Sequence, residues 1–223
     1  MPLALSLRRC GRRSSGLPVG REPVNLGRAA PWARAAGVAG HVANVLLAGF
    51  FAVEAGRRRV LPVSLGSAND LVGSIGTTFM VPVVLAVSPS PWTRRLGLGA
   101  TGVLTVAGPA LVLRLVPFAV QMPIAIGAFE GLAAWMVLSC RGRRGTLPAG
   151  VVRLGGLSGG GVLAGGAVVG VGLLLPEGSL PRRAALVIGG APGLAGWLAM
   201  PTWFLRLGRA LSAGEPLRRA ERA

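Results

Sequence analysis

Residues 154–175, LGGLSGGGVLAGGAVVGVGLLL, point to the fold class of this chain, because they run for 22 positions without a charged side chain. An α-helix rises about 1.5 Å per residue, so this run is about 33 Å long as a helix, close to the roughly 30 Å hydrocarbon thickness of a bilayer. A helix also pairs its own backbone amides and carbonyls, which lipid cannot do. The run therefore predicts a membrane-spanning helix.

Five similar apolar runs accompany this one, and together they predict an all-α bundle of about six transmembrane helices. The expected spans are 35–53, 71–88, 96–117, 122–140, 154–175 and 184–205. The third and fourth form one stretch that as a single helix would be about 67 Å long, roughly twice the hydrocarbon thickness, so a turn is expected near Val120. Residues 1–34 are expected to form a disordered basic cytoplasmic tail, 35–206 the transmembrane domain and 207–223 a short cytoplasmic tail.

The composition supports lipid as the solvent of this chain. Hydrophobic residues make up 52% of it, charged residues only 14%, and the mean hydropathy is +0.61. An ordinary soluble domain has about 25% charged residues. With so few charges, a water-facing surface would carry large apolar patches, whereas lipid-facing side chains are expected to be apolar.

The arginines predict the orientation in the membrane. All 24 basic residues are arginine, which together with the abundance of Ala, Gly and Pro is interpreted as the codon bias of a high-GC bacterium. Eighteen of them fall at the ends that would share one side with the N-terminus, so both termini are expected inside a bacterial cytoplasmic (plasma) membrane. The cluster Arg57, Arg58 and Arg59 violates this pattern and leaves a five-span alternative open. Because the arginines flank apolar runs without interleaved aromatic residues, nucleic acid is not expected as a partner.

The glycines of the fifth span predict close helix packing. Gly161 and Gly165, and Gly166 and Gly170, are four residues apart, a spacing that lets helix backbones approach one another in lipid. We therefore expect this span at the buried centre of the bundle.

Polar residues inside the expected spans are the candidate functional residues, because ionisable groups at membrane depth are costly. Glu130 lies near the middle of the fourth span and Arg114 in the third, and a turn near Val120 would allow them to form an ion pair. Two alternatives remain, since Arg114 could extend to the interface, and Glu130 could be protonated or hydrogen-bonded by a neighbouring helix. His41 and Asn44 share one face of the first span, where a hydrogen bond between helices is the default interpretation.

Other polar motifs predict structural roles. Asn69 and Asp70 precede the second span and are interpreted as its N-cap. The two cysteines, Cys10 and Cys140, form neither a disulfide framework nor a metal site by their spacing. No metal site and no cofactor are predicted.

One motif resembles that of an intramembrane protease. Gly156-Leu157-Ser158-Gly159 is similar to the G-x-S-G motif of rhomboid proteases, a resemblance that implies a serine nucleophile activated by a histidine on a later helix. The only histidine, His41, comes earlier in the chain, so the sequence predicts no catalytic residue.

The last span carries a second resemblance. Residues 201–209, PTWFLRLGR, resemble the closing segment of small polytopic membrane proteins of high-GC bacteria, a family of unknown function with no catalytic residue to transfer. Trp203 is expected at the membrane interface, with Arg206 and Arg209 anchoring the cytoplasmic end.

Three functions are compatible with these residues. The first is a membrane-embedded structural or partner-binding subunit, whose partner would be another membrane protein or a second copy of the chain. The second is a small transporter or permease component that uses Glu130 and Arg114. The third, disfavoured by the missing histidine, is an intramembrane enzyme that uses Ser158.

Overall fold

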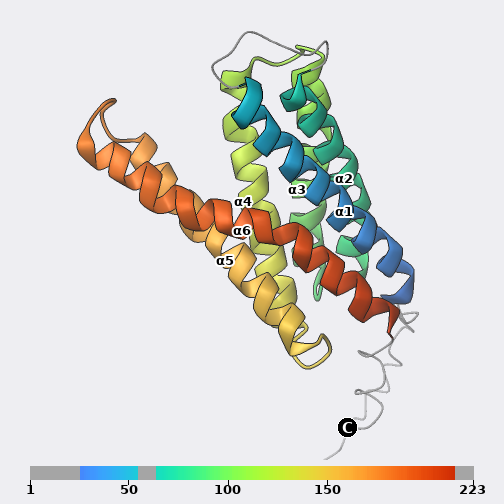
Figure 1. Cartoon of the computed structure of the whole chain (residues 1–223). Coiled ribbons are helices and arrows are strands. Elements are labelled where there is room, and N and C mark those ends of the chain that lie inside the picture. Colours follow the sequence, from blue (N-terminus) through green and yellow to red (C-terminus); the bar gives the residue numbers. More distant parts are fainter. Residues whose placement is uncertain (1–25, 55–63, 214–223) are drawn as a thin grey trace, which may run out of the picture.

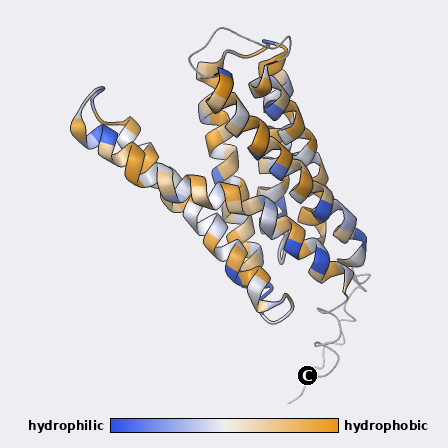
Figure 2. Cartoon of the chain, viewed as in Figure 1, coloured by the Kyte–Doolittle hydropathy of each residue, from blue (hydrophilic) through white to orange (hydrophobic). Residues whose placement is uncertain are grey.

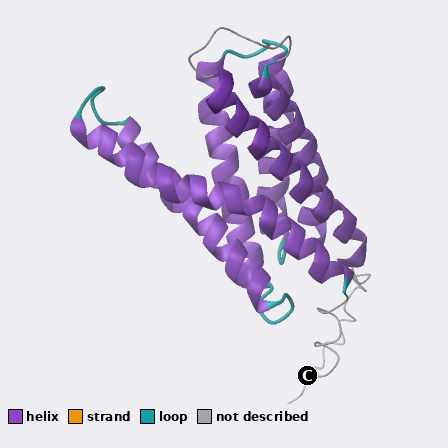
Figure 3. Cartoon of the chain, viewed as in Figure 1, coloured by secondary structure: helices purple, strands orange, loops and turns teal. Residues whose placement is uncertain are grey.

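The computed structural model describes residues 26–54 and 64–213, and every regular element within these ranges is a helix (Figure 3). The elements in chain order are the 3₁₀ turn η1 (Leu26–Ala29), α1 (Ala30–Gly49), the π-helical turn η2 (Phe50–Glu54), α2 (Leu65–Val87), α3 (Pro91–Val112), α4 (Phe118–Gly142), α5 (Ala149–Leu173) and α6 (Leu180–Ser212). The predicted all-α class is confirmed.

Within the part of the chain that the structure describes, six helical segments are long and apolar enough to cross a membrane, which supports six spans rather than five. The first, 26–54, comprises η1, α1 and η2. Large apolar side chains are exposed along the helices, for example Val45 and Val187, both at 71%, and Figure 2 shows apolar residues along all the helices drawn. Lipid is the solvent that such a surface requires.

The helix ends differ from the expected spans because capping residues set them. α3 begins at Pro91 rather than 96, since the Ser90 hydroxyl accepts a hydrogen bond from the Thr93 amide at 3.2 Å and proline suits the first helical position. It ends at Val112, so the turn to α4 covers 113–117 and lies before Val120. The helix α6 continues to Ser212, beyond the expected end at 205.

The first expected boundary is also displaced. The chain is helical from Leu26, so the expected tail of residues 1–34 includes the start of the first span. Residues 1–25, with Cys10, lie outside the described part of the chain. The same holds for 55–63, with Arg57 to Arg59, and for 214–223.

The helix α5 lies at the side of the molecule, and its predicted place at the buried centre is wrong. It packs against α6 along its length and against α4 as far as Gly166, while α1 to α4 pack in sequence and α6 crosses α1 (Figure 1). The last turns of α5 and the first turns of α6 project from the bundle as a two-helix arm, residues 167–188. Because nothing else in the described chain covers the arm, Val171, Leu174 and Val187 are exposed.

The predicted glycine packing holds for two of the four glycines. A Cβ on Gly161 would lie 2.9 Å from the Pro192 carbonyl oxygen, and one on Gly165 would lie 2.5 Å from the Gly193 amide nitrogen, so α5 and α6 meet backbone to backbone there. Gly166 instead faces α4, where the Glu130 carboxyl group occupies the space of a Cβ. Gly170 has open space above it and makes no close approach.

An aromatic cluster joins the C-terminal halves of α4 and α6. Trp203, expected at the membrane interface, is fully buried instead. Its indole Nε1 donates a hydrogen bond to the Val151 carbonyl of α5 at 3.1 Å, so the buried N–H is satisfied. Its ring meets Trp135 and Phe204 edge to face, with centroids 6.0 and 4.8 Å away. Trp135 donates in turn to the Ser88 hydroxyl at 3.0 Å. A buried indole whose N–H is paired is a stable core residue.

Arginines gather at one end of the bundle, where α1 begins and α6 ends (Figure 1). This end holds Arg28, Arg34, Arg94, Arg95, Arg141, Arg143, Arg144, Arg153, Arg206 and Arg209; the opposite end holds Arg114, Arg182 and Arg183. Arg143 reaches across to donate to the Val87 and Ala86 carbonyls at the end of α2, at 3.1 and 3.3 Å. We refer to the end of the bundle where α1 begins and α6 ends as the arginine-rich end. That it faces the cytoplasm stays a prediction.

Candidate functional site

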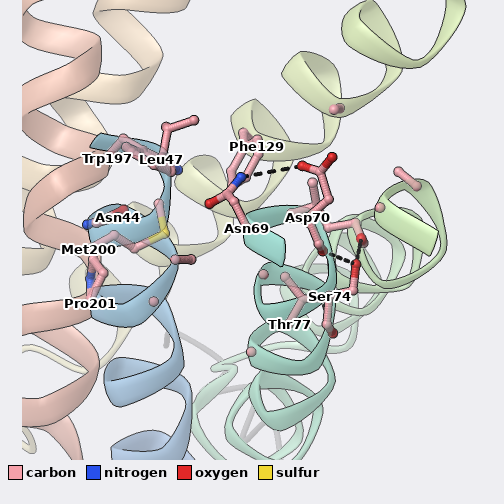
Figure 4. Close-up of a pocket in the computed structure, with 18 of the residues that line it drawn as sticks. Asn44, Leu47, Asn69, Asp70, Ser74, Thr77, Phe129, Trp197, Met200 and Pro201 are labelled. Carbon is pink, nitrogen blue, oxygen red and sulfur yellow. Dashed lines mark hydrogen bonds between the residues drawn. The ribbon is translucent and has the colours of Figure 1, made fainter. Parts of the chain in front are cut away.

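A cavity of about 430 Å³ lies between α1, α2, α3, α4 and α6, in the half of the bundle away from the arginine-rich end. Its walls are mainly apolar. The polar side chains that line it are Asn44, Asn69, Asp70, Ser74, Thr77 and Gln121, and the aromatic ones are Phe118, Phe129, Trp197 and Phe204 (Figure 4). Phe118 and Met122, which are 62% and 40% exposed, show that the cavity reaches the surface beside the start of α4.

Asn69 and Asp70 line this cavity because α2 begins several residues before them. The helix starts at Leu65, where the Ser64 hydroxyl accepts a hydrogen bond from the Gly66 amide at 3.2 Å. The buried Glu54 carboxylate accepts from the Leu65 amide and the Ser64 hydroxyl, at 3.0 and 2.9 Å, and so caps the same helix. The predicted N-cap role of Asn69 and Asp70 is therefore wrong, because both lie in the second turn of α2.

Among the described residues that line the cavity, Asp70 is the only charged one. Its carboxylate accepts one long hydrogen bond, from Asn69 Nδ2 at 3.4 Å. Within the described ranges no arginine or histidine lies at ion-pair distance from it, since the one salt bridge there joins Arg182 and Glu177 at 3.5 Å. Among the residues that the structure describes, the Asp70 carboxylate therefore has no cation to pair with.

Close packing of α3 holds the backbone of Asp70 in place. The Ser74 hydroxyl donates to the Asp70 carbonyl at 2.8 Å and is also 3.4 Å from the Leu104 carbonyl of α3. Gly108 of α3 lies against this group, and a Cβ there would meet the Asp70 carbonyl oxygen at 2.5 Å. Only glycine permits this approach, which fixes the position of Asp70 in the cavity wall.

Some of the other polar groups of the wall are hydrogen-bonded to described residues and some are not. Thr77 is satisfied by the Ser74 carbonyl and the Thr105 hydroxyl, both at 2.9 Å. The side chains of Asn44 and Gln121 make no hydrogen bond to any residue in the described ranges. Their amide groups can therefore orient a ligand, as small numbers of polar groups do in apolar pockets.

The predicted pair of Glu130 and Arg114 does not form. Arg114 lies in the turn after α3, exposed and with a positive φ of 56°. Glu130 is twelve residues into α4, about 18 Å along the helix axis from that turn's end. Its carboxylate rests on Gly166 of α5, and neither residue lines the cavity.

His41 and Asn44 separate into two roles. His41 Nε2 lies 3.3 Å from the Thr202 hydroxyl of α6, which is the expected hydrogen bond between helices. Asn44, one turn further along α1, faces the cavity. The hydroxyl of Ser158 donates to the Gly196 carbonyl at 2.5 Å and is 2% exposed, so no serine and histidine pair is assembled from these residues.

Sequence reasoning found Asn44 but missed Asp70 and Gln121 as cavity residues. The available signal was a carboxylate within a few residues of an apolar run, and it was interpreted as a cap. No three His, Cys, Asp or Glu side chains cluster as a metal site within 26–54 and 64–213. Comparison of the chain with protein-family models, with curated proteins and with solved structures finds no match.

Proposed function

We propose that this protein binds, within the membrane, a small and largely apolar molecule that carries one positive charge, with Asp70 as its counter-charge. The observation that carries the proposal is a carboxyl group in the wall of an apolar cavity that has no cationic partner within 26–54 and 64–213. Such groups cost several kcal/mol at membrane depth unless they are paired or hydrated, so they mark functional sites.

Size and wall chemistry support this class of ligand. About 430 Å³ lies within the roughly 300 to 1,000 Å³ of small-molecule sites. Phe129 and Trp197 line the cavity together with Asp70, and aromatic rings attract organic cations. The amides of Asn44 and Gln121, which bond to no described residue, would orient the ligand by hydrogen bonds. The membrane we propose is the bacterial cytoplasmic one, on the basis of the arginine-rich end.

Asp70→Asn is expected to weaken binding of the apolar cations ethidium and tetraphenylphosphonium at least tenfold, or about 1.4 kcal/mol, because it removes the counter-charge and keeps the shape. Ethidium fluorescence titration of the purified full chain in detergent measures this, with tetraphenylphosphonium as competitor. Glu130→Gln is the matched control, since it removes a carboxylate outside the cavity and should leave the affinity unchanged. Equal affinity of the Asp70→Asn variant and the unaltered chain would contradict the proposal.

Filling the cavity gives an independent test. Gly73 lines the cavity and has open space where a Cβ would stand, so Gly73→Leu is expected to fold normally and to displace the ligand. Gly102→Leu, on an equally open and exposed position of α3 away from the cavity, is the control. If both variants bound ethidium equally well, the cavity would not be the site.

A second candidate function is the partner-binding subunit predicted from the sequence, and the arm supports it. Its exposed apolar residues belong to two helices that leave the bundle together, and a further membrane helix or a second copy could pack there. Extraction in native nanodiscs tests this, since a chain that migrates only as a monomer would contradict it. We propose no catalytic role for Ser158, whose hydroxyl is committed to the Gly196 carbonyl.

A further inference from the structure

A second cavity, of about 640 Å³, lies at the arginine-rich end between the last turns of α4, the turn that follows it and the first turns of α5. Arg141, Arg144 and Arg153 line its polar side. Val137, Val152 and Leu157 line its apolar side, which continues toward the middle of the membrane. We call this the α4–α5 pocket. It is separate from the cavity that contains Asp70.

The three arginines have no anionic partner among the described residues. The four acidic side chains there lie elsewhere: Glu54 caps α2, Asp70 lines the first cavity, Glu130 rests on α5 and Glu177 pairs with Arg182. Arg143, in the same turn, is already committed to the end of α2. Three guanidinium groups around one hollow repel one another, so the pocket favours an anion, and phosphate matches guanidinium geometry well.

The apolar side of the pocket indicates what carries the phosphate. Leu157 is 64% exposed, and Gly156 and Gly160 have open space where a Cβ would stand, which leaves a smooth strip along α5. The strip begins beside the arginines and runs along a helix that crosses the membrane. A molecule with an anionic head and a hydrocarbon chain fits both parts, whereas a soluble phosphate fits only one.

We propose that the α4–α5 pocket binds an anionic phospholipid of the leaflet at the arginine-rich end, with its phosphate among Arg141, Arg144 and Arg153 and an acyl chain along Gly156 and Gly160. Basic pockets between membrane helices are suited to lipid headgroups of this charge. The lipid would join α4 to α5 at the end where the turn 143–148 connects them.

The test uses the purified full chain in detergent, titrated with phosphatidylglycerol or with phosphatidylcholine and followed by native mass spectrometry and thermal unfolding. We expect retained phosphatidylglycerol and a higher melting temperature with phosphatidylglycerol only. The triple variant Arg141→Gln, Arg144→Gln, Arg153→Gln should weaken phosphatidylglycerol binding at least tenfold. Arg206→Gln with Arg209→Gln, at the same end but on exposed positions of α6 outside the pocket, should not.

Two further measurements distinguish a bound phospholipid from a bound soluble phosphate. Gly156→Leu places a side chain on the apolar strip without a clash, and it should weaken lipid binding while all arginines remain. Glycerol 3-phosphate or inorganic phosphate alone should raise the melting temperature little. The proposal is overturned if phosphatidylcholine binds as tightly as phosphatidylglycerol, or if the Arg206 and Arg209 variant loses as much phosphatidylglycerol affinity as the triple variant. It is also overturned if Gly156→Leu leaves lipid binding unchanged, or if free phosphate raises the melting temperature as much as phosphatidylglycerol does.

Discussion

Trp203→Ala is expected to destabilise the protein by about 3 kcal/mol, the lower part of the range for large-to-small changes at a buried tryptophan. The side chain is fully buried, contacts Trp135 and Phe204, and donates a hydrogen bond to Val151. In lipid the hydrophobic contribution to this free-energy loss is smaller, but the void left by the indole ring and the lost dispersion contacts still cost stability. Unfolding in mixed micelles with increasing sodium dodecyl sulfate, followed by circular dichroism, measures the difference.

Trp92→Ala is the control for this variant, because Trp92 is 69% exposed at the start of α3. It should change the free energy of unfolding by a few tenths of a kcal/mol. Equal effects of the two variants would mean that the aromatic cluster does not exist and that Trp203 sits at the interface, as its sequence context suggested.

Gly165→Leu is expected to force α5 away from α6 and to cost up to about 3 kcal/mol, the upper range for overpacking. A Cβ at this position would already lie 2.5 Å from the Gly193 amide nitrogen and 2.6 Å from its Cα, and backbone atoms cannot rotate away. The same unfolding assay measures the loss. Circular dichroism should report little change in total helix, because each helix keeps its own hydrogen bonds.

Gly170→Leu is the matched control, since it makes the same substitution in the same helix where no atom lies within 4 Å of a Cβ. It should fold and unfold like the unaltered chain. A loss equal to that of Gly165→Leu would show that the leucine acts through helix propensity or lipid contact and that the backbone approach is not the cause.

These two glycines also show what the sequence could and could not predict. Four-residue spacing identifies glycines that share a helix face, but in a helix so rich in glycine several faces qualify. Which face finds a partner depends on the place of α6, so Gly161 and Gly165 were predicted correctly while Gly166 faces α4 and Gly170 faces open space. The six spans could be predicted because helix length and apolar composition alone decide them.

The candidate site was harder to predict because it depends on helix ends. Asn69 and Asp70 resemble a cap before an apolar run. However, Ser64 and Glu54 cap the helix about one turn earlier, so both side chains lie within the helix and line the cavity. The ion pair of Arg114 and Glu130 assumed a turn near Val120. With the turn at 113–117, Arg114 lies in the turn itself and Glu130 lies more than three helical turns further along the chain in α4, and hydropathy alone contains no signal for that shift.

Single-cysteine labelling tests the central claim, that this chain crosses a membrane six times with its arginine-rich end inside, most directly. In a chain whose Cys10 and Cys140 are replaced by serine and alanine, cysteines are placed singly at Leu115, in the turn between α3 and α4, and at Glu177, in the turn between α5 and α6. Two more are placed at Trp92 and Ala149 near the arginine-rich end. A maleimide that cannot cross membranes should label the first two in intact cells and the last two only after permeabilisation. Equal labelling of all four in intact cells, or the reversed pattern, would contradict the account.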